Sequence, residues 1–154
     1  MEDHTTYNYQ RHIEGIQQAM QCDLVAIALL QSENQNFQVH WQNATGNITK
    51  RFQRTVLQSG KGVAGVVYKT GKPILVLESE VYGEKDDLYN YPIISSEQLA
   101  SFAVLPLFEN NRVKGILLAG YRKSKSMSDE KYELLQSLIA PTFDFHFSEE
   151  LMGE

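Results

Sequence analysis

The chain has 154 residues, of which 42% are hydrophobic, and a formal net charge of −5 at pH 7. This size and apolar fraction fit a single globular domain over residues 1–154 and exclude an intrinsically disordered chain. The acidic balance disfavours nucleic-acid binding, which needs a basic face, and no apolar run is long enough to span a bilayer.

Cysteine and histidine usage restricts the chemistry further. The single cysteine, Cys22, excludes an intrachain disulfide, and the polar, acidic N-terminal residues lack the pattern of a signal peptide. Both features favour a cytoplasmic protein. The histidines are scattered without metal-ligand spacing, so no metal site is expected.

The first third of the chain predicts a helix followed by strands. Apolar residues recur at helical spacing before residue 21, and a continuous apolar run follows, which is typical of a buried central strand. Apolar and polar residues then alternate around Trp41, so Trp41 is expected to point inward. The predicted elements are a helix over residues 5–21, strands over 23–30 and 37–42, a turn over 44–50 and a short helix over 51–57.

A glycine-rich stretch over residues 59–76 predicts a loop, a short helix and a strand. Gly60 and Gly62 permit a tight turn before a helix over 63–69, and Gly71 stands where a C′ glycine belongs. The first amides of a helix have no intrahelical partner, and the small residues here leave them open, so this helix start is a candidate anion site. A simple turn without a ligand is the alternative.

Residues 78–98 form a long segment without clear periodicity, after a strand over 73–77. The segment contains Tyr82, Tyr89 and Tyr91, which argue against disorder. A connection of this length in a compact domain is usually functional, and we expect a lid over the glycine-rich helix start. The alternative is a packed surface loop whose aromatic side chains cover the sheet.

The last third of the chain predicts a hairpin and a helix. Ser128 is expected to cap the helix, with Met127 packed on Tyr132. Consecutive strands flanked by amphipathic helices favour an α+β fold with a mostly antiparallel sheet. The terminal helices could pack together or form a dimer bundle with a second chain. The predicted elements are strands over 99–108 and 112–121, a turn over 109–111, and a helix with an apolar stripe of Leu134, Leu135, Leu138 and Ile139 that extends past Pro141 to 143–147.

Several motifs in this order resemble the GAF domain family. They are Gly60-x-Gly62-x-Ala64-Gly65-x-Val67, Thr70-Gly71-Lys72-Pro73-Ile74, Leu99-Ala100-Ser101 with Pro106-Leu107, and Gly115-Ile116-Leu117. The resemblance covers nearly the whole chain. It implies an α+β fold with both terminal helices on one face of the sheet and the glycine-rich helix and lid loop on the other. It also implies a sensor module rather than an enzyme.

Within that family the chain is similar to the NreA-like stand-alone nitrate receptors of staphylococcal-type bacteria. The resemblance implies that nitrate, and no cofactor, is bound in a small closed pocket by backbone amides at a helix N-terminus. It further implies an oxygen-sensing NreB-like sensor histidine kinase as partner, in a two-component system that controls nitrate respiration, with nitrate relieving a restraint on the kinase. The matching ligand-binding positions are Trp41, Val63, Ala64, Tyr91, Pro92 and Ile93.

Other functions known in the same family remain alternatives. A GAF domain can be a protein-interaction module with a collapsed pocket, or a sensor of another small ligand such as a cyclic nucleotide, although we do not recognise the Asn-Lys-Phe-Asp-Glu signature of that group. A bilin-binding domain would need a well-placed cysteine. Some GAF domains reduce free methionine sulfoxide, but that chemistry uses cysteine pairs and Cys22 stands alone.

Overall fold

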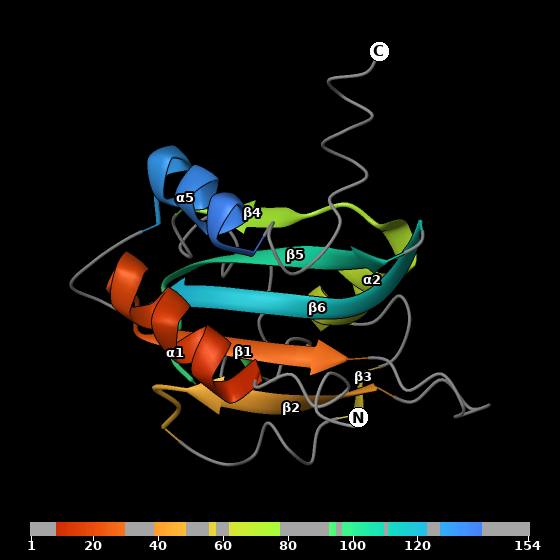
Figure 1. Ribbon diagram of the computed structural model, residues 1–154, viewed down its shortest axis with the longest axis horizontal. Coiled ribbons are helices and arrows are strands. Elements are labelled where there is room, and N and C mark those ends of the chain that lie inside the picture. The colour runs from red at the N-terminus through yellow and green to blue at the C-terminus, as the bar shows by residue number, and fades with distance from the viewer. Residues whose placement is uncertain are drawn as a thin grey trace, which may run out of the picture.

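The computed structural model describes residues 9–29, 39–48, 56–57, 62–77, 93–94, 97–109, 111–122 and 127–139. A six-stranded sheet has the order β3-β2-β1-β6-β5-β4, and every neighbouring pair is antiparallel (Figure 1). The elements are α1 (Tyr9–Met20), β1 (Leu24–Leu29), β2 (Val39–Thr45), β3 (Val56–Leu57), α2 (Gly62–Thr70), β4 (Ile74–Val76), β5 (Ser101–Glu109), β6 (Arg112–Tyr121) and α5 (Asp129–Ile139).

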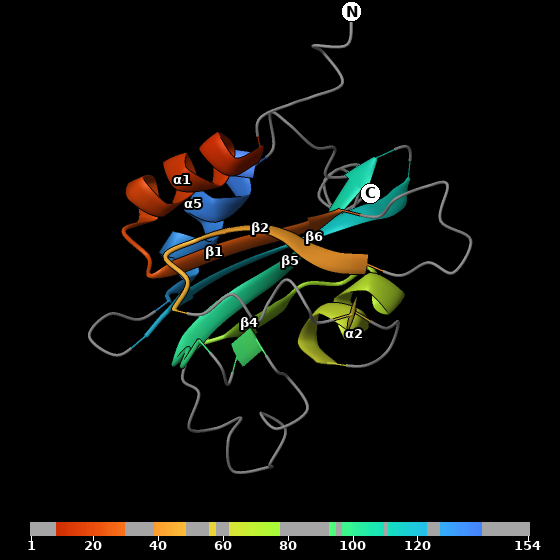
Figure 2. The same ribbon diagram turned by 90° about the horizontal axis from the view of Figure 1, so that it is seen from below.

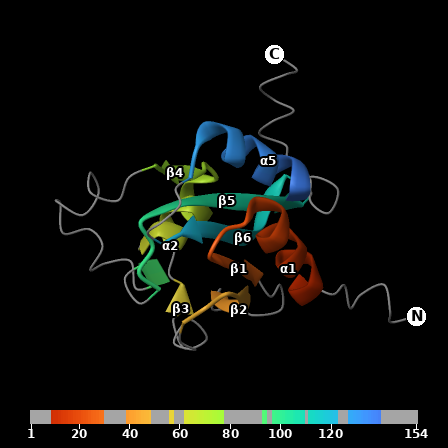
Figure 3. The ribbon, with the colours of Figure 1, turned by 90° about the vertical axis from the view of Figure 1, so that its left-hand side faces the viewer.

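Helices cover both faces of this sheet. α1 and α5 lie side by side on one face and α2 lies on the other, as Figures 2 and 3 show from two directions. The central strand β1 is therefore buried on both faces, which explains its continuous apolar sequence. Its side chains alternate between two cores: Val25 and Ile27 face α1 and α5, whereas Leu24, Ala26 and Ala28 face α2. The predicted α+β layout of the helices is confirmed.

The apolar stripe of α1 and the N-cap of α5 are confirmed, whereas one residue of the α5 stripe is not. The α1 residues Ile13, Ile16 and Met20 are buried as one stripe. The Ser128 hydroxyl accepts a hydrogen bond from the Lys131 amide at 3.1 Å, as an N-cap should. Leu134 was expected in the apolar stripe of α5 but is 38% exposed, because the helix turns Leu135 and Ile139 into the core instead.

Two predictions in the first third of the chain are wrong. The turn expected from residue 44 begins later, because Ala44 and Thr45 still pair with β1 as part of β2. Val56–Leu57 is a strand rather than a helix, because it pairs with the first residues of β2. The predicted helical residues 5–8, 51–55 and 143–147 lie outside the described residues, and so does the predicted lid over 78–98 except for residues 93–94 and 97–98.

Candidate functional site

The N-terminal end of α2 lies against the sheet. Val63, Ala64 and Val67 are buried in the core between α2 and the sheet, so this helix turns its first residues inward. Its first turn contains no acidic residue, and Lys69 stands in its last turn. The positive end of the helix dipole is therefore not offset by a carboxylate of the helix itself, which favours an anion there.

Gly71 ends α2 in the manner that the sequence predicts. Its φ angle is +71°, in the left-handed region, and its amide donates to the Val67 carbonyl at 2.8 Å. The chain then turns directly into β4, which pairs with β5 at the edge of the sheet. Gly71 thus ends α2 directly before the edge strand β4, while the first turn of the helix is buried in the core.

Trp41 of β2 belongs to the same core as Val63 and Ala64. Its side chain is only 1% exposed, in agreement with the predicted inward orientation. Among the described residues, its indole nitrogen Nε1 has no hydrogen-bond partner. A buried N–H without an acceptor costs about 1–3 kcal/mol, so this donor requires an explanation.

Ile93 and Ile94 complete this side of the core. Both are buried in the cluster that contains Trp41 and Ala64, and they follow the segment over 78–92. The structure thus brings together Trp41, Val63, Ala64 and Ile93 from three distant parts of the chain. Tyr91 and Pro92, the other two predicted site residues, lie outside the described residues.

We refer to Trp41, Val63, Ala64 and Ile93 as the Trp41 cluster. Its walls are apolar, and its two kinds of hydrogen-bonding group are the donors of Trp41 and of the first turn of α2. Burial raises the pKa of Tyr121 and of Tyr132, but both tyrosines lie on the α1 and α5 face of the sheet. In the described part of the chain, no group of three or more His, Cys, Asp or Glu side chains could hold a metal ion.

Sequence reasoning missed one feature beside this cluster. Glu97 is a buried acidic residue, and the side chain of Arg122 binds both its carboxylate and its carbonyl oxygen. The sequence carried little signal for it, because an acidic residue in a long polar segment is normally solvated.

No helix among the described residues is long and apolar enough to cross a membrane.

Comparison with known proteins identifies the fold. The family model of the GAF domain matches residues 9–142. The chain belongs to the GAF domain family. The family resemblance of the glycine-rich motifs is thus confirmed, while a search of curated protein sequences finds no match.

Several solved structures are similar to this chain. A mutated NreA protein from Staphylococcus aureus, described as altered in its nitrate binding site, is 29% identical, with 84% of this chain and 94% of that chain covered and a TM-score of 0.75. A hypothetical protein from S. aureus is 30% identical, with coverage of 79% and 98% and a TM-score of 0.73. Free methionine-R-sulfoxide reductase from Neisseria meningitidis, at 20% identity and a TM-score of 0.64, with coverage of 86% and 71%, shares the fold alone.

Proposed function

We propose that this GAF domain is a nitrate receptor, with the ligand in a small closed pocket at the Trp41 cluster. The observation that carries the proposal is the Trp41 indole N–H, which is buried in the same core as the first turn of α2 and has no acceptor among the described residues. An anion in this core would accept from Trp41 and from the amides of Val63 and Ala64, which as first-turn amides have no intrahelical partner. The similarity to NreA supports nitrate as this anion.

The physical properties of nitrate suit such a site. It is a planar, singly charged and weakly hydrated anion that accepts hydrogen bonds and donates none, and the cluster offers donors in apolar walls. Hydrogen bonds to a charged group contribute roughly 1.5–3 kcal/mol each, and a partly buried helix terminus adds up to about 2 kcal/mol. After ordering costs, binding of about −4 to −7 kcal/mol follows, which is roughly millimolar to 10 µM affinity.

The same site disfavours anions of higher charge. The described members of the cluster are all apolar, so none of them supplies a cation to balance a second negative charge. Sulfate and the dianion of phosphate would therefore have to be desolvated without compensation. We expect both to bind far more weakly than nitrate. The wall opposite α2 would be completed by Ile93 together with Tyr91 and Pro92.

The proposed role is signalling rather than catalysis. Methionine sulfoxide reduction needs more than one cysteine, whereas this sequence has only Cys22, which is buried on the other face of the sheet. We propose that the domain acts in the cytoplasm on an NreB-like histidine kinase of a two-component system. Nitrate can change that interaction only if it prefers one conformation of the receptor, and the segment over 78–92 is the proposed two-state element.

Isothermal titration of the purified protein with nitrate tests the proposal. Trp41 is the only tryptophan, so its fluorescence reports on the site in the same samples. Saturable one-site binding with a fluorescence change supports a nitrate receptor, and sulfate and nitrite titrations measure its selectivity. Neither heat nor a fluorescence change up to high millimolar nitrate would overturn the proposal and leave a GAF interaction module.

A further inference from the structure

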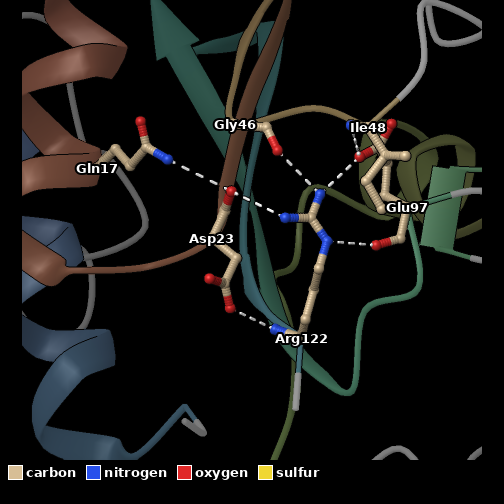
Figure 4. Close-up of polar contacts among 6 residues, drawn as sticks. All are labelled: Gln17, Asp23, Gly46, Ile48, Glu97 and Arg122. Carbon is tan, nitrogen blue, oxygen red and sulfur yellow. Dashed lines mark hydrogen bonds and ion pairs between the residues drawn. The ribbon is translucent and has the colours of Figure 1, made fainter. Parts of the chain in front are cut away.

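Arg122 binds several separate parts of the chain at once. It follows directly after β6, and its guanidinium donates to the carbonyl and carboxylate oxygens of Glu97 at 2.8 and 2.7 Å (Figure 4). It also donates to the carbonyl oxygens of Gly46 at 2.9 Å and Asp23 at 3.4 Å. The planar fork of an arginine permits this set of bonds, which the single ammonium of a lysine cannot reproduce.

Glu97 is the buried member of this network. Its side chain is 1% exposed, whereas that of Arg122 is 23% exposed. The Glu97 carboxylate also accepts from the Ile48 amide at 2.6 Å, so its charge is compensated by an ion pair and a backbone donor. A buried carboxylate would be strongly unfavourable without these partners, and Glu97 is thereby held in one position.

The main chain of Glu97 leads directly to the Trp41 cluster. Its amide donates to the carbonyl oxygen of Ile93 at 3.0 Å, and the amide of Leu99 donates to that of Ile94 at 3.1 Å. These two hydrogen bonds tie residues 97–99 to residues 93–94. Arg122 therefore binds the residue whose amide is bonded to Ile93, which belongs to the same core as Trp41 and Ala64.

The same arginine contacts the junction that follows α1. Its own amide donates to the Asp23 carboxylate at 2.6 Å. The Asp23 carbonyl, which the guanidinium binds, also accepts from the Gln17 side chain of α1 at 3.3 Å. Arg122 thus joins Glu97 to the α1–β1 junction (Figure 4).

We propose that Glu97 and Arg122 are positioning residues of the Trp41 site, which hold the Ile93 wall in its binding position and link it to the end of α1. This inference rests on the proposed nitrate site. Neither residue touches the ligand. The pair restricts the conformations of Ile93 before the ligand binds. Binding then has a smaller entropy cost, because less of the site must be ordered.

Two variants of the full chain test the inference. Arg122→Lys keeps the positive charge and loses the fork, and Glu97→Gln keeps an oxygen acceptor and loses the negative charge. Each should weaken nitrate binding by roughly tenfold, by analogy with the groups that orient metal ligands. Ile139→Val on α5 is the control for general stability, because it lies in the core on the opposite face and should leave the nitrate dissociation constant unchanged.

Hydrogen exchange without ligand separates this inference from the proposed function. The amides of Glu97 and Leu99 should exchange faster in Arg122→Lys than in the parent or in Ile139→Val, whether or not nitrate is a ligand. If the parent does not bind nitrate, the proposed function fails. The exchange result still tests whether Arg122 holds Glu97 and Leu99 in place. Unchanged exchange would overturn the inference, and so would faster exchange with an unchanged nitrate affinity. If Arg122→Lys does not fold, the same measurements on Glu97→Gln decide.

Discussion

Ala28 of β1 lies opposite Trp41 of β2, although Ile27, the residue before it, lies opposite Asn43. Gln42 is the extra residue in β2, and the register shifts there by one as in a β-bulge. Side chains alternate along a regular strand, so Trp41 and Ala44 would point to opposite faces without this shift. With it, both pack into the core under α2, and the bulge therefore delivers Trp41 to the candidate site.

Trp41→Phe tests the role of the indole N–H. The substitution keeps an aromatic ring and removes the donor that has no acceptor among the described residues. Loss of a hydrogen bond to a charged ligand should weaken nitrate binding by about 1.5–3 kcal/mol, which is about tenfold or more. Isothermal titration measures this loss.

Tyr121→Phe is the matched control for that substitution. It also removes a polar group from a buried aromatic side chain, but on the α1 and α5 face. Its nitrate affinity should equal that of the parent. Equal affinities for Trp41→Phe and the parent would exclude the indole as a ligand donor.

Tyr121 also predicts how stability depends on alkaline pH. Burial, with smaller effects of Cys22 and Asp23, raises its pKa from 10.0 to about 12, and its hydroxyl donates to the Met20 carbonyl at 2.7 Å. The folded state therefore holds this proton more tightly than the unfolded state. The resulting stability is present below pH 10.0 and is lost as the pH rises to about 12.

Denaturant unfolding at a series of pH values measures this effect. Below pH 10, Tyr121→Phe should lower the free energy of unfolding by about 1 kcal/mol, because the Met20 carbonyl loses its donor. Between pH 10 and 12 the parent should lose stability more steeply than Tyr121→Phe. Lysine side chains titrate in both proteins, so the difference between the two curves isolates Tyr121. Parallel curves over this range would contradict the assignment.

Gly46 and Gly15 should respond in opposite directions to alanine. Gly46 has a φ angle of +81°, and a Cβ there would lie 2.0 Å from the Asp23 carbonyl oxygen. Gly46→Ala should lower the free energy of unfolding by more than about 1 kcal/mol, because the backbone must move at the junction that Arg122 binds. Urea unfolding measures the change.

Gly15→Ala is the control for Gly46→Ala. Gly15 lies within α1, and a Cβ there would meet nothing within 4 Å. Because alanine favours helix more than glycine does, Gly15→Ala should stabilise the protein by about 0.5–1 kcal/mol. A loss of stability in Gly15→Ala would show that this part of the α1 surface is more closely packed than the structure indicates.

Ser128→Ala tests the cap of α5. The hydroxyl accepts from the Lys131 amide, so its removal leaves a donor at the helix start without that partner. The free energy of unfolding should fall by about 1 kcal/mol, and nitrate binding should not change, since α5 lies on the opposite face of the sheet. A Ser128→Asp variant, which restores an acceptor at the N-cap, should recover the stability.

Patterns confined to neighbouring residues were sufficient for most of the fold. The continuous apolar run of β1, the Gly71 stop of α2 and the Ser128 cap of α5 each act within one or two turns of chain, so sequence reasoning predicts them directly. The burial of Trp41 follows from the alternation of apolar residues before it, while the bulge at Gln42 places it in one core with Ala44. The sequence by itself therefore determined the fold class and the ends of these helices.

Features that depend on a distant partner were decided only by the tertiary structure. The strand at Val56–Leu57 and the bulge at Gln42 exist because a neighbouring strand pairs with them, and neither leaves a periodic signal of its own. Arg122 meets Glu97 across 25 residues and Gly46 across 76. A charged residue in a loop has the same local sequence whether it is solvated or buried in an ion pair, and only the packing of the whole chain determines which of the two it becomes.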